Sequence, residues 1–250
     1  MWKLSRTIYV VVLYLIVLTG CRTENPRLTP TVEATSPPTV FPTEPPTPTT
    51  VPPRVLTVCM GQEPASLFLY NDGSTAARSV RQAIYDGPMD QSGYDNVPVI
   101  LERKPDLANQ DIRLEPVSVT AGDLIVDASG AMVNLAQDVS YFPSGFRESG
   151  CIQTYSGQGE VQVDQMFVRF SLRPDIRWSD GTQLTADDSV YSFEIARKLY
   201  PRVRADLLAH TVSYQAVDLL TVEWSGLPGY LDPVYAGFFF TPLPRHLGDQ

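Results

Sequence analysis

The segment FVRFSLRPDIRWSDGTQLTADDSVYSFE spans residues 167–194 and combines the signals of a strand, a turn and a helix start. Apolar and polar side chains alternate through residues 166–172, which is the two-residue period of a strand buried on one face. Pro174 ends this strand because proline has no N–H to donate. Residues 179–182, Ser-Asp-Gly-Thr, have the composition of a tight turn. The segment therefore predicts that a strand turns directly into a helix.

The residues after the turn predict a helix over residues 186–200. Thr185 suits the N-cap, and Asp188 occupies the third helical position, where it replaces the usual Glu or Gln of a capping box. Asp187 and Asp188 also lie at the positive end of the helix dipole. The side chains expected on the buried face are Val190, Phe193 and Ala196. The helix must end before Pro201.

Weaker patterns on both sides predict further elements. Strands are expected at residues 55–59, 97–101, 112–119, 132–135 and 219–225, and helices at residues 76–85 and 204–210. The first helix is expected to bury Ala77, Val80 and Ile84. Residues 226–244 are rich in Gly, Pro and aromatic side chains, which indicates an ordered loop. The expected elements include both strands and helices, and the predicted fold is α/β, of the α+β type with a mixed sheet.

The N-terminus has the pattern of a secretion signal. Basic residues precede an apolar run of 11 residues, 8–18, which is too short to span a bilayer as a helix. Leu18-Thr-Gly-Cys21 follows and resembles the bacterial lipobox. Residues 1–20 are therefore expected to be a lipoprotein signal peptide, with Cys21 as the lipid attachment site. A plain secretory signal or a short membrane anchor is the alternative.

Residues 21–53 combine the lipidated Cys21 with a Pro/Thr-rich linker. Ten of the chain's 22 prolines lie between Pro26 and Pro53. Proline removes amide donors and fixes φ, so the linker is expected to be disordered, with polyproline-II character. It is either a stalk that raises the following domain above the membrane or a passive spacer. The globular domain is expected to occupy residues 54–250.

Composition excludes several classes of function. The chain has 19 basic and 28 acidic residues and a net charge of −9, which argues against nucleic acid and anionic lipid as partners. His210 and His246 lie far apart and have no metal-ligand spacing. The sequence has no Gly-rich phosphate loop and no nucleophile elbow, so we expect no enzyme, no cofactor and no metal. Cys59 and Cys151 either form a disulfide or are two separate small residues.

The central segment closely resembles the signature of the family 5 extracellular solute-binding proteins, the peptide- and nickel-binding receptors of ABC importers. The matching residues are Leu172, Arg173, Pro174, Trp178, Asp180, Gly181, Thr185, Ala186, Asp187 and Asp188. Ser189 is a small departure from the pattern. Residues 63–67, 214–224 and 242–247 give weaker matches in the family's order. The resemblance covers about residues 54–250.

The resemblance implies two α/β lobes that trap a ligand between them. Because members are roughly twice as long as the globular region, residues 54–250 are expected to be a truncated domain, with lobe I present and the second lobe largely missing. The resemblance places Gly73, Ser74 and Thr75 at the ligand cleft, and the alternative is an ordinary turn and helix cap. Trp178 is expected to be a packed aromatic near the hinge. The acids Asp180, Asp187 and Asp188 do not have the spacing of a calcium loop, so turn and capping roles are expected for them.

By the same resemblance, the chain is expected to be the substrate-binding component of an ABC importer. It would capture oligopeptides or related solutes outside the cytoplasm, held at the cell membrane by its lipid, and deliver them to the permease subunits. The alternative is a truncated surface lipoprotein that acts as an interaction or sensory module without a role in transport.

Overall fold

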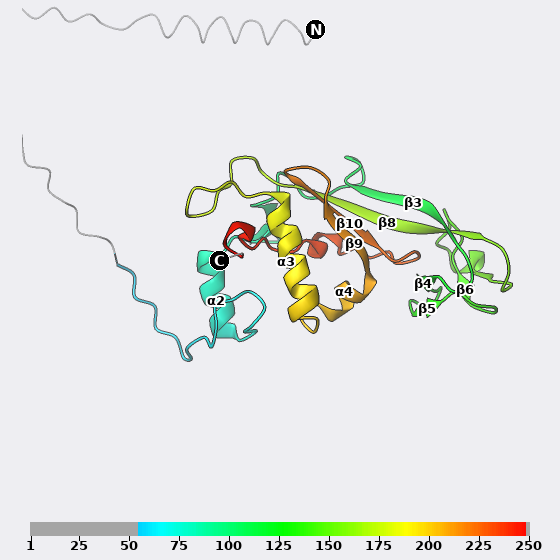
Figure 1. Cartoon of the computed structure of the whole chain (residues 1–250), viewed down its shortest axis with the longest axis horizontal. Helices are drawn as coiled ribbons and strands as arrows, with labels where there is room; N and C mark the ends of the chain where they lie inside the picture. The colour runs from blue at the N-terminus through cyan, green and yellow to red at the C-terminus, as the bar shows by residue number, and fades with distance from the viewer. Residues whose placement is uncertain (1–54, 249–250) are drawn as a thin grey trace, which may run out of the picture. The chain divides into compact units, whose positions relative to one another are not determined.

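The computed structural model describes residues 55–248 (Figure 1). The expected signal peptide, Cys21 and almost all of the Pro/Thr-rich linker lie outside these residues. Among the described residues one α-helix precedes eight strands, and two further α-helices precede the last two strands. The prediction of a fold of the α+β type is confirmed, and its described sheets are antiparallel throughout, where a mixed sheet was expected. Within the described residues no helix has the length and apolar character needed to cross a membrane.

A four-stranded sheet with the order β3-β8-β10-β9 organises the fold. Its strands are β3 (Ile112–Val119), β8 (Val161–Ser171), β10 (Thr221–Gly226) and β9 (Thr211–Ala216). β8 pairs with both β3 and β10, and Val168 lies opposite Ile112 on one side and Trp224 on the other. Val168 and Trp224 are fully buried. The strand predicted from alternation is confirmed, and it begins five residues earlier than predicted.

Helix α3 (Ala186–Leu199) covers the apolar face of this sheet and packs on β9 and β10. Phe193 and Ala196 are buried as predicted, and Val190 is half-buried. Two small polar residues that the pattern did not single out, Ser189 and Ser192, are fully buried. Their hydroxyl groups find buried partners: Ser189 Oγ lies 2.7 Å from Tyr214 Oη, and Ser192 Oγ lies 2.6 Å from Tyr70 Oη.

The chain returns to this core after β10 through three consecutive buried aromatics, Phe238, Phe239 and Phe240. Arg204, just before α4 (Ala205–His210), holds this segment: its Nη1 donates to Phe239 O at 2.8 Å, and its guanidinium lies 4.4 Å from the centroid of the Phe240 ring. Burial lowers the pKa of Arg204. The loop predicted at residues 226–244 therefore contributes to the core.

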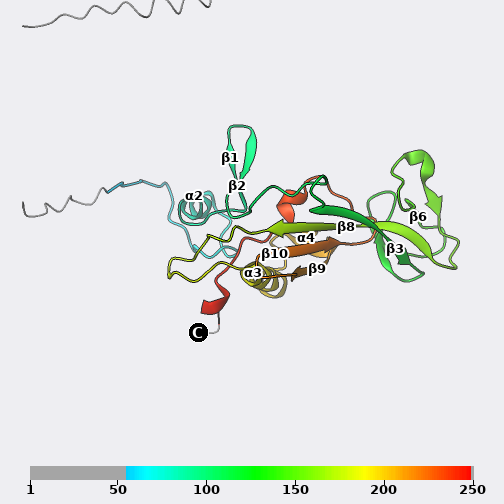
Figure 2. The ribbon, with the colours of Figure 1, turned by 90° about the horizontal axis from the view of Figure 1, so that it is seen from above.

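The β3–β8 ribbon continues into a second, smaller core. Short strand pairs surround it: β4 (Leu124–Val126) with β5 (Met132–Asn134), and β6 (Ser140–Tyr141) with β7 (Gln153–Thr154). Its buried residues are Val119, Ile125, Leu135, Tyr141, Tyr155 and Val163. Figures 1 and 2 both show these strands at one end of the ribbon. Asp164 fixes a neighbouring loop, because its carboxylate accepts from Ser144 Oγ at 2.5 Å and Gly145 N at 3.0 Å.

The N-terminal part of the domain departs from the prediction. The strand expected at residues 55–59 is wrong: the segment is not a strand, and Val55 and Leu56 are 82% and 86% exposed. An apolar run favours a strand only where a partner edge is free, and no described strand pairs with this segment. Helix α2 (Thr75–Ile84) confirms the predicted helix, but Arg81 is buried beside Ala77 while Ile84 is exposed.

Two other boundaries also shift. A hairpin of β1 (Met89–Ser92) and β2 (Asp95–Pro98) occupies the region of the strand expected at residues 97–101. Pro98 ends β2, and Leu101 forms only an isolated bridge with Leu172. The strand expected at residues 219–225 corresponds to β10, which starts at Thr221. The neighbouring strand β9 was not predicted, because its six residues directly follow a helix without a turn signal.

Candidate functional site

The signature segment of the sequence folds into a polar junction centred on Asp188. The predicted capping box of Thr185 and Asp188 is confirmed, and in it Thr185 N donates to Asp188 Oδ2 at 2.9 Å. Asp188 N also donates to the backbone carbonyl of Thr185 at 3.2 Å. The same carboxylate oxygen accepts from Trp178 Nε1 at 3.2 Å. Asp188 is only 4% exposed, so these bonds satisfy a carboxylate that water hardly reaches.

Asp188 also binds a segment that lies far away in the sequence. Its Oδ1 accepts from Arg245 N at 2.9 Å, and its backbone carbonyl accepts from Leu243 N at 3.2 Å. The capping pattern alone gave no sign of these contacts, because the pattern is complete within residues 185–188. The junction therefore fastens residues 243–245 to the start of α3.

Asp180 links the signature turn to the same distant segment, through His246. Its Oδ1 accepts from Thr182 N at 2.8 Å inside the predicted turn, and Gly181 takes the positive φ of 89° that the turn requires. Its Oδ2 lies 2.7 Å from His246 Nε2. The bond from Thr182 N, followed by the contact with His246, lowers the pKa of Asp180 to about 2. Asp187 is exposed and lies 3.5 Å from Arg245 Nη1.

A cavity of about 400 Å³ lies between the signature turn and residues 241–247. The end of α2 forms another part of its wall. Its aromatic and charged lining residues are Tyr85, Asp86, Arg177, Trp178, Asp180 and His246, and the remaining walls are largely apolar, with Ile84, Ile100, Ile176, Leu184, Pro242, Pro244 and Leu247. Such a lining can hold an apolar or aromatic group and leaves carboxylates near it for polar contacts.

Of the residues singled out by the signature, Trp178 and Asp180 line this cavity. Four others lie in the adjoining turn and at the start of α3: Gly181, Thr185, Asp187 and Asp188. Gly73, Ser74 and Thr75 are not among its lining residues. Ser74 is the N-cap of α2, accepting from Ala77 N at 3.1 Å, whereas the end of α2 that lines the cavity is Ile84. A helix of ten residues is about 15 Å long, so the two groups lie apart. A ligand role for residues 73–75 remains a prediction.

The sequence also raised the questions of a disulfide and of a metal site. Cys59 is exposed and Cys151 is half-buried, and both are free thiols. Within residues 55–248, no three or more His, Cys, Asp or Glu side chains gather in a way that could hold a metal ion. The carboxylates at the junction accept hydrogen bonds from the protein itself, so their observed roles are structural.

Residues 134–228 match the family described as bacterial extracellular solute-binding proteins, family 5 Middle. Among solved structures, the oligopeptide binding protein from Thermus thermophilus in complex with a pentapeptide is similar at 16% identity and a TM-score of 0.45, over 70% of this chain and 22% of that chain. The putative peptide binding protein AppA from Clostridium difficile is similar at 20% identity and a TM-score of 0.29, over 52% and 24%. This chain thus spans less than a quarter of either structure. No curated protein matches it.

Proposed function

We propose that this chain, whose residues 134–228 match the bacterial extracellular solute-binding proteins of family 5, captures a peptide or related solute outside the cytoplasm for an ABC importer. The matched residues include β8, β9 and β10, three of the four strands of the central sheet, and α3, the helix that covers it. No covalent step is needed for such a role, since binding alone commits the solute to the permease.

The observation that carries the proposal is the cavity beside the signature turn. Its volume of about 400 Å³ falls in the range of small-molecule sites, roughly 300–1,000 Å³. Trp178 and the isoleucines can cover an apolar side chain of a peptide, while Asp86 lines the same cavity and offers a carboxylate to an ammonium group. In the whole receptor, closure around a solute held here would remove it from water.

Calorimetry of the full-length chain with a mixture of short peptides tests this role. The variant Ser179→Trp places a bulky ring at an exposed position on the cavity wall and should weaken peptide binding at least tenfold. Ser149→Trp adds the same ring at an exposed position between β6 and β7 and should leave binding unchanged. Absence of peptide binding, or equal binding by the two variants, would contradict the proposal.

The N-terminal features extend the proposal to location. We propose that residues 1–20 are removed as a signal peptide, that Cys21 is acylated, and that residues 22–53 tether the domain of residues 54–250 to the membrane. A tethered receptor stays at high effective concentration near its permease. Cells fed a palmitate analogue should label the chain, and Cys21→Ala should abolish the label. Unchanged labelling of that variant would remove the lipid anchor from the proposal.

A further inference from the structure

A second cavity, the polar groove, lies on the sheet face that α3 does not cover. Its volume is about 680 Å³, and it shares no lining residue with the cavity beside the signature turn. Its lining residues are Arg103, Asn109, Gln110, Asp111, Arg113, Glu115, Arg169, Ser171, Val217, Asp218 and Thr221. Three arginines and three acids therefore line it, together with amides and hydroxyls.

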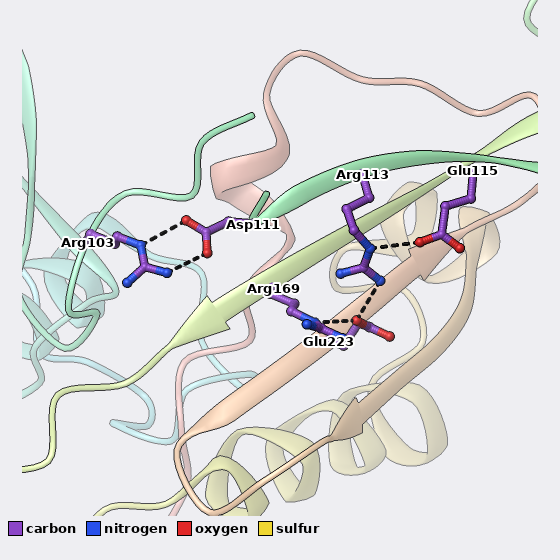
Figure 3. Close-up of polar contacts among 6 residues, drawn as sticks. All are labelled: Arg103, Asp111, Arg113, Glu115, Arg169 and Glu223. Atoms are coloured by element: carbon purple, nitrogen blue, oxygen red, sulfur yellow. Dashed lines mark hydrogen bonds and ion pairs between the residues drawn. The ribbon is translucent and has the colours of Figure 1, made fainter. Parts of the chain in front are cut away.

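The charged side chains come from three adjacent strands and the loop before them. Arg113 and Glu115 lie on β3, Arg169 lies on β8, and Glu223 lies on β10 directly opposite Arg169. Figure 3 shows this cluster next to the pair formed by Arg103 and Asp111. The opposite side of the same strands faces the apolar core, so the charges are confined to one side of the sheet.

The carboxylates of this region are already occupied by donors from the protein. Asp111 accepts two bonds from Arg103, at 2.9 and 2.7 Å. Glu223 Oε2 accepts from Arg113 Nη2 at 3.0 Å and from Arg169 Nε at 2.7 Å. Burial opposes ionisation of Glu223, but the bonds from the two arginines outweigh it and lower the pKa of this carboxyl. Asp218, in the loop before β10, accepts from Leu220 N at 2.8 Å.

The donors, by contrast, are not all used. Arg113 Nη1 is buried and has no hydrogen-bond partner among the described residues, and its guanidinium carbon lies 5.5 Å from the centroid of the Phe167 ring. Among the described residues, the side chain of Arg169 donates a hydrogen bond only through Nε, and it is 47% exposed. A guanidinium carries five N–H donors, so both arginines keep donors to spare.

We propose that the polar groove binds the carboxylate of a small solute through the guanidinium groups of Arg113 and Arg169. The incoming carboxylate displaces the side chain of Glu115 from Arg113. In this structure Glu115 accepts from Arg113 Nε at 2.8 Å, and its side chain is 49% exposed. The solute carboxylate also takes the free Nη donors of Arg169. The site does not depend on the peptide role of the other cavity.

The surroundings favour a carboxylate over a phosphate. Planar carboxylates match the fork of a guanidinium, and the bidentate pair of Arg103 with Asp111 shows this geometry at the edge of the same groove. A phosphate dianion would carry about twice the charge into a groove that three acids also line, so like-charge repulsion disfavours it. A singly charged carboxylate that displaces Glu115 leaves the balance of charge around Arg113 unchanged.

Calorimetric titration of the full-length chain with N-acetylglycine tests the site, with neutral N-acetylglycinamide as the matched ligand control. The carboxylate should give saturable binding and the amide none. Arg169→Gln should weaken binding about tenfold, as expected for the loss of a charge-assisted hydrogen bond. Glu115→Gln should strengthen binding, because it removes the competing carboxylate. Two exposed substitutions on helices, Arg78→Gln and Glu194→Gln, repeat these charge changes away from the groove and should leave binding unaltered.

Each contrary outcome overturns a specific part of the proposal. Equal heats from the acid and the amide would show that no carboxylate is recognised. Tighter binding of inorganic phosphate than of N-acetylglycine would overturn the carboxylate assignment. If Glu115→Gln behaves like Glu194→Gln, the solute does not bind at Arg113. Glu115 and Arg169 are both half-exposed, so native circular dichroism is expected for their variants and separates binding from folding.

Discussion

Asp188 and Arg245 are joined across 57 positions of the sequence by a hydrogen bond of 2.9 Å from the Arg245 amide to the Asp188 carboxylate. The other oxygen of the same carboxylate receives donors from Thr185 and Trp178. One buried side chain therefore holds a helix start, an aromatic residue of the signature turn and a distant segment. The cavity beside the signature turn takes its shape from these three parts.

Asp188→Ala should lower the free energy of unfolding by about 3 kcal/mol, because it removes a helix cap and leaves several donors without an acceptor. Urea denaturation followed by circular dichroism measures the change. Asp187→Ala removes the neighbouring acid, which is exposed, and should change stability by less than about 0.5 kcal/mol. Equal effects of the two substitutions would mean that Asp188 acts only through its charge at the helix start.

Asp180 should make stability depend on acid pH. Its pKa is lowered to about 2 in the folded chain from an ordinary value of 3.8. A carboxyl with a lowered pKa adds stability above its unfolded pKa and loses that contribution as the pH falls through the folded value. The urea midpoint of the native chain should therefore fall between about pH 4 and pH 2 more steeply than that of Asp180→Asn. Parallel profiles for the two proteins would contradict this expectation.

The bond of 2.6 Å between Tyr70 Oη and Ser192 Oγ should be worth about 1 kcal/mol beyond packing. Both residues are buried, so either single substitution, Tyr70→Phe or Ser192→Ala, leaves the other hydroxyl without its partner. The double variant should then lose less stability than the two single variants together. Strictly additive losses in this double-mutant cycle would show that the two hydroxyls are not coupled.

Two glycines with nearly the same backbone conformation should respond differently to alanine. Gly181 and Gly229 have φ values of 89° and 84°, and an L-residue at such a φ costs roughly 1–2 kcal/mol. A Cβ at Gly181 meets open space, but one at Gly229 would lie 2.2 Å from Val126 O. Gly229→Ala should therefore cost more than Gly181→Ala in urea denaturation. Equal costs would show that the β4 backbone can move aside.

The features that could be predicted from sequence are those whose cause is local. The alternation in β8, the turn at Gly181 and the capping box of Thr185 and Asp188 depend on neighbouring residues, and all three are present. The supposed strand at residues 55–59 failed because a strand also needs a partner, and propensity does not supply one.

Local sequence patterns predict only part of the candidate site. Trp178 and Asp180 stood out through the signature, but their contact with residues 241–247 depends on how the chain returns after β10. The polar groove was missed because its charges are spread over strands β3, β8 and β10 and meet only through strand register. Arg113 and Glu223 lie 110 positions apart, and neither belongs to a motif.

The position of β8 between β3 and β10 has a consequence for synthesis on the ribosome. β10 begins 50 positions after the end of β8, so β8 leaves the exit tunnel well before its second partner has been made. Until then β10 cannot cover the side chains of Val168 and Phe170. Pairings of this range close slowly. We therefore expect the nascent chain to bind chaperones that recognise exposed apolar strands, and to be released once β10 has emerged and Trp224 has paired with Val168.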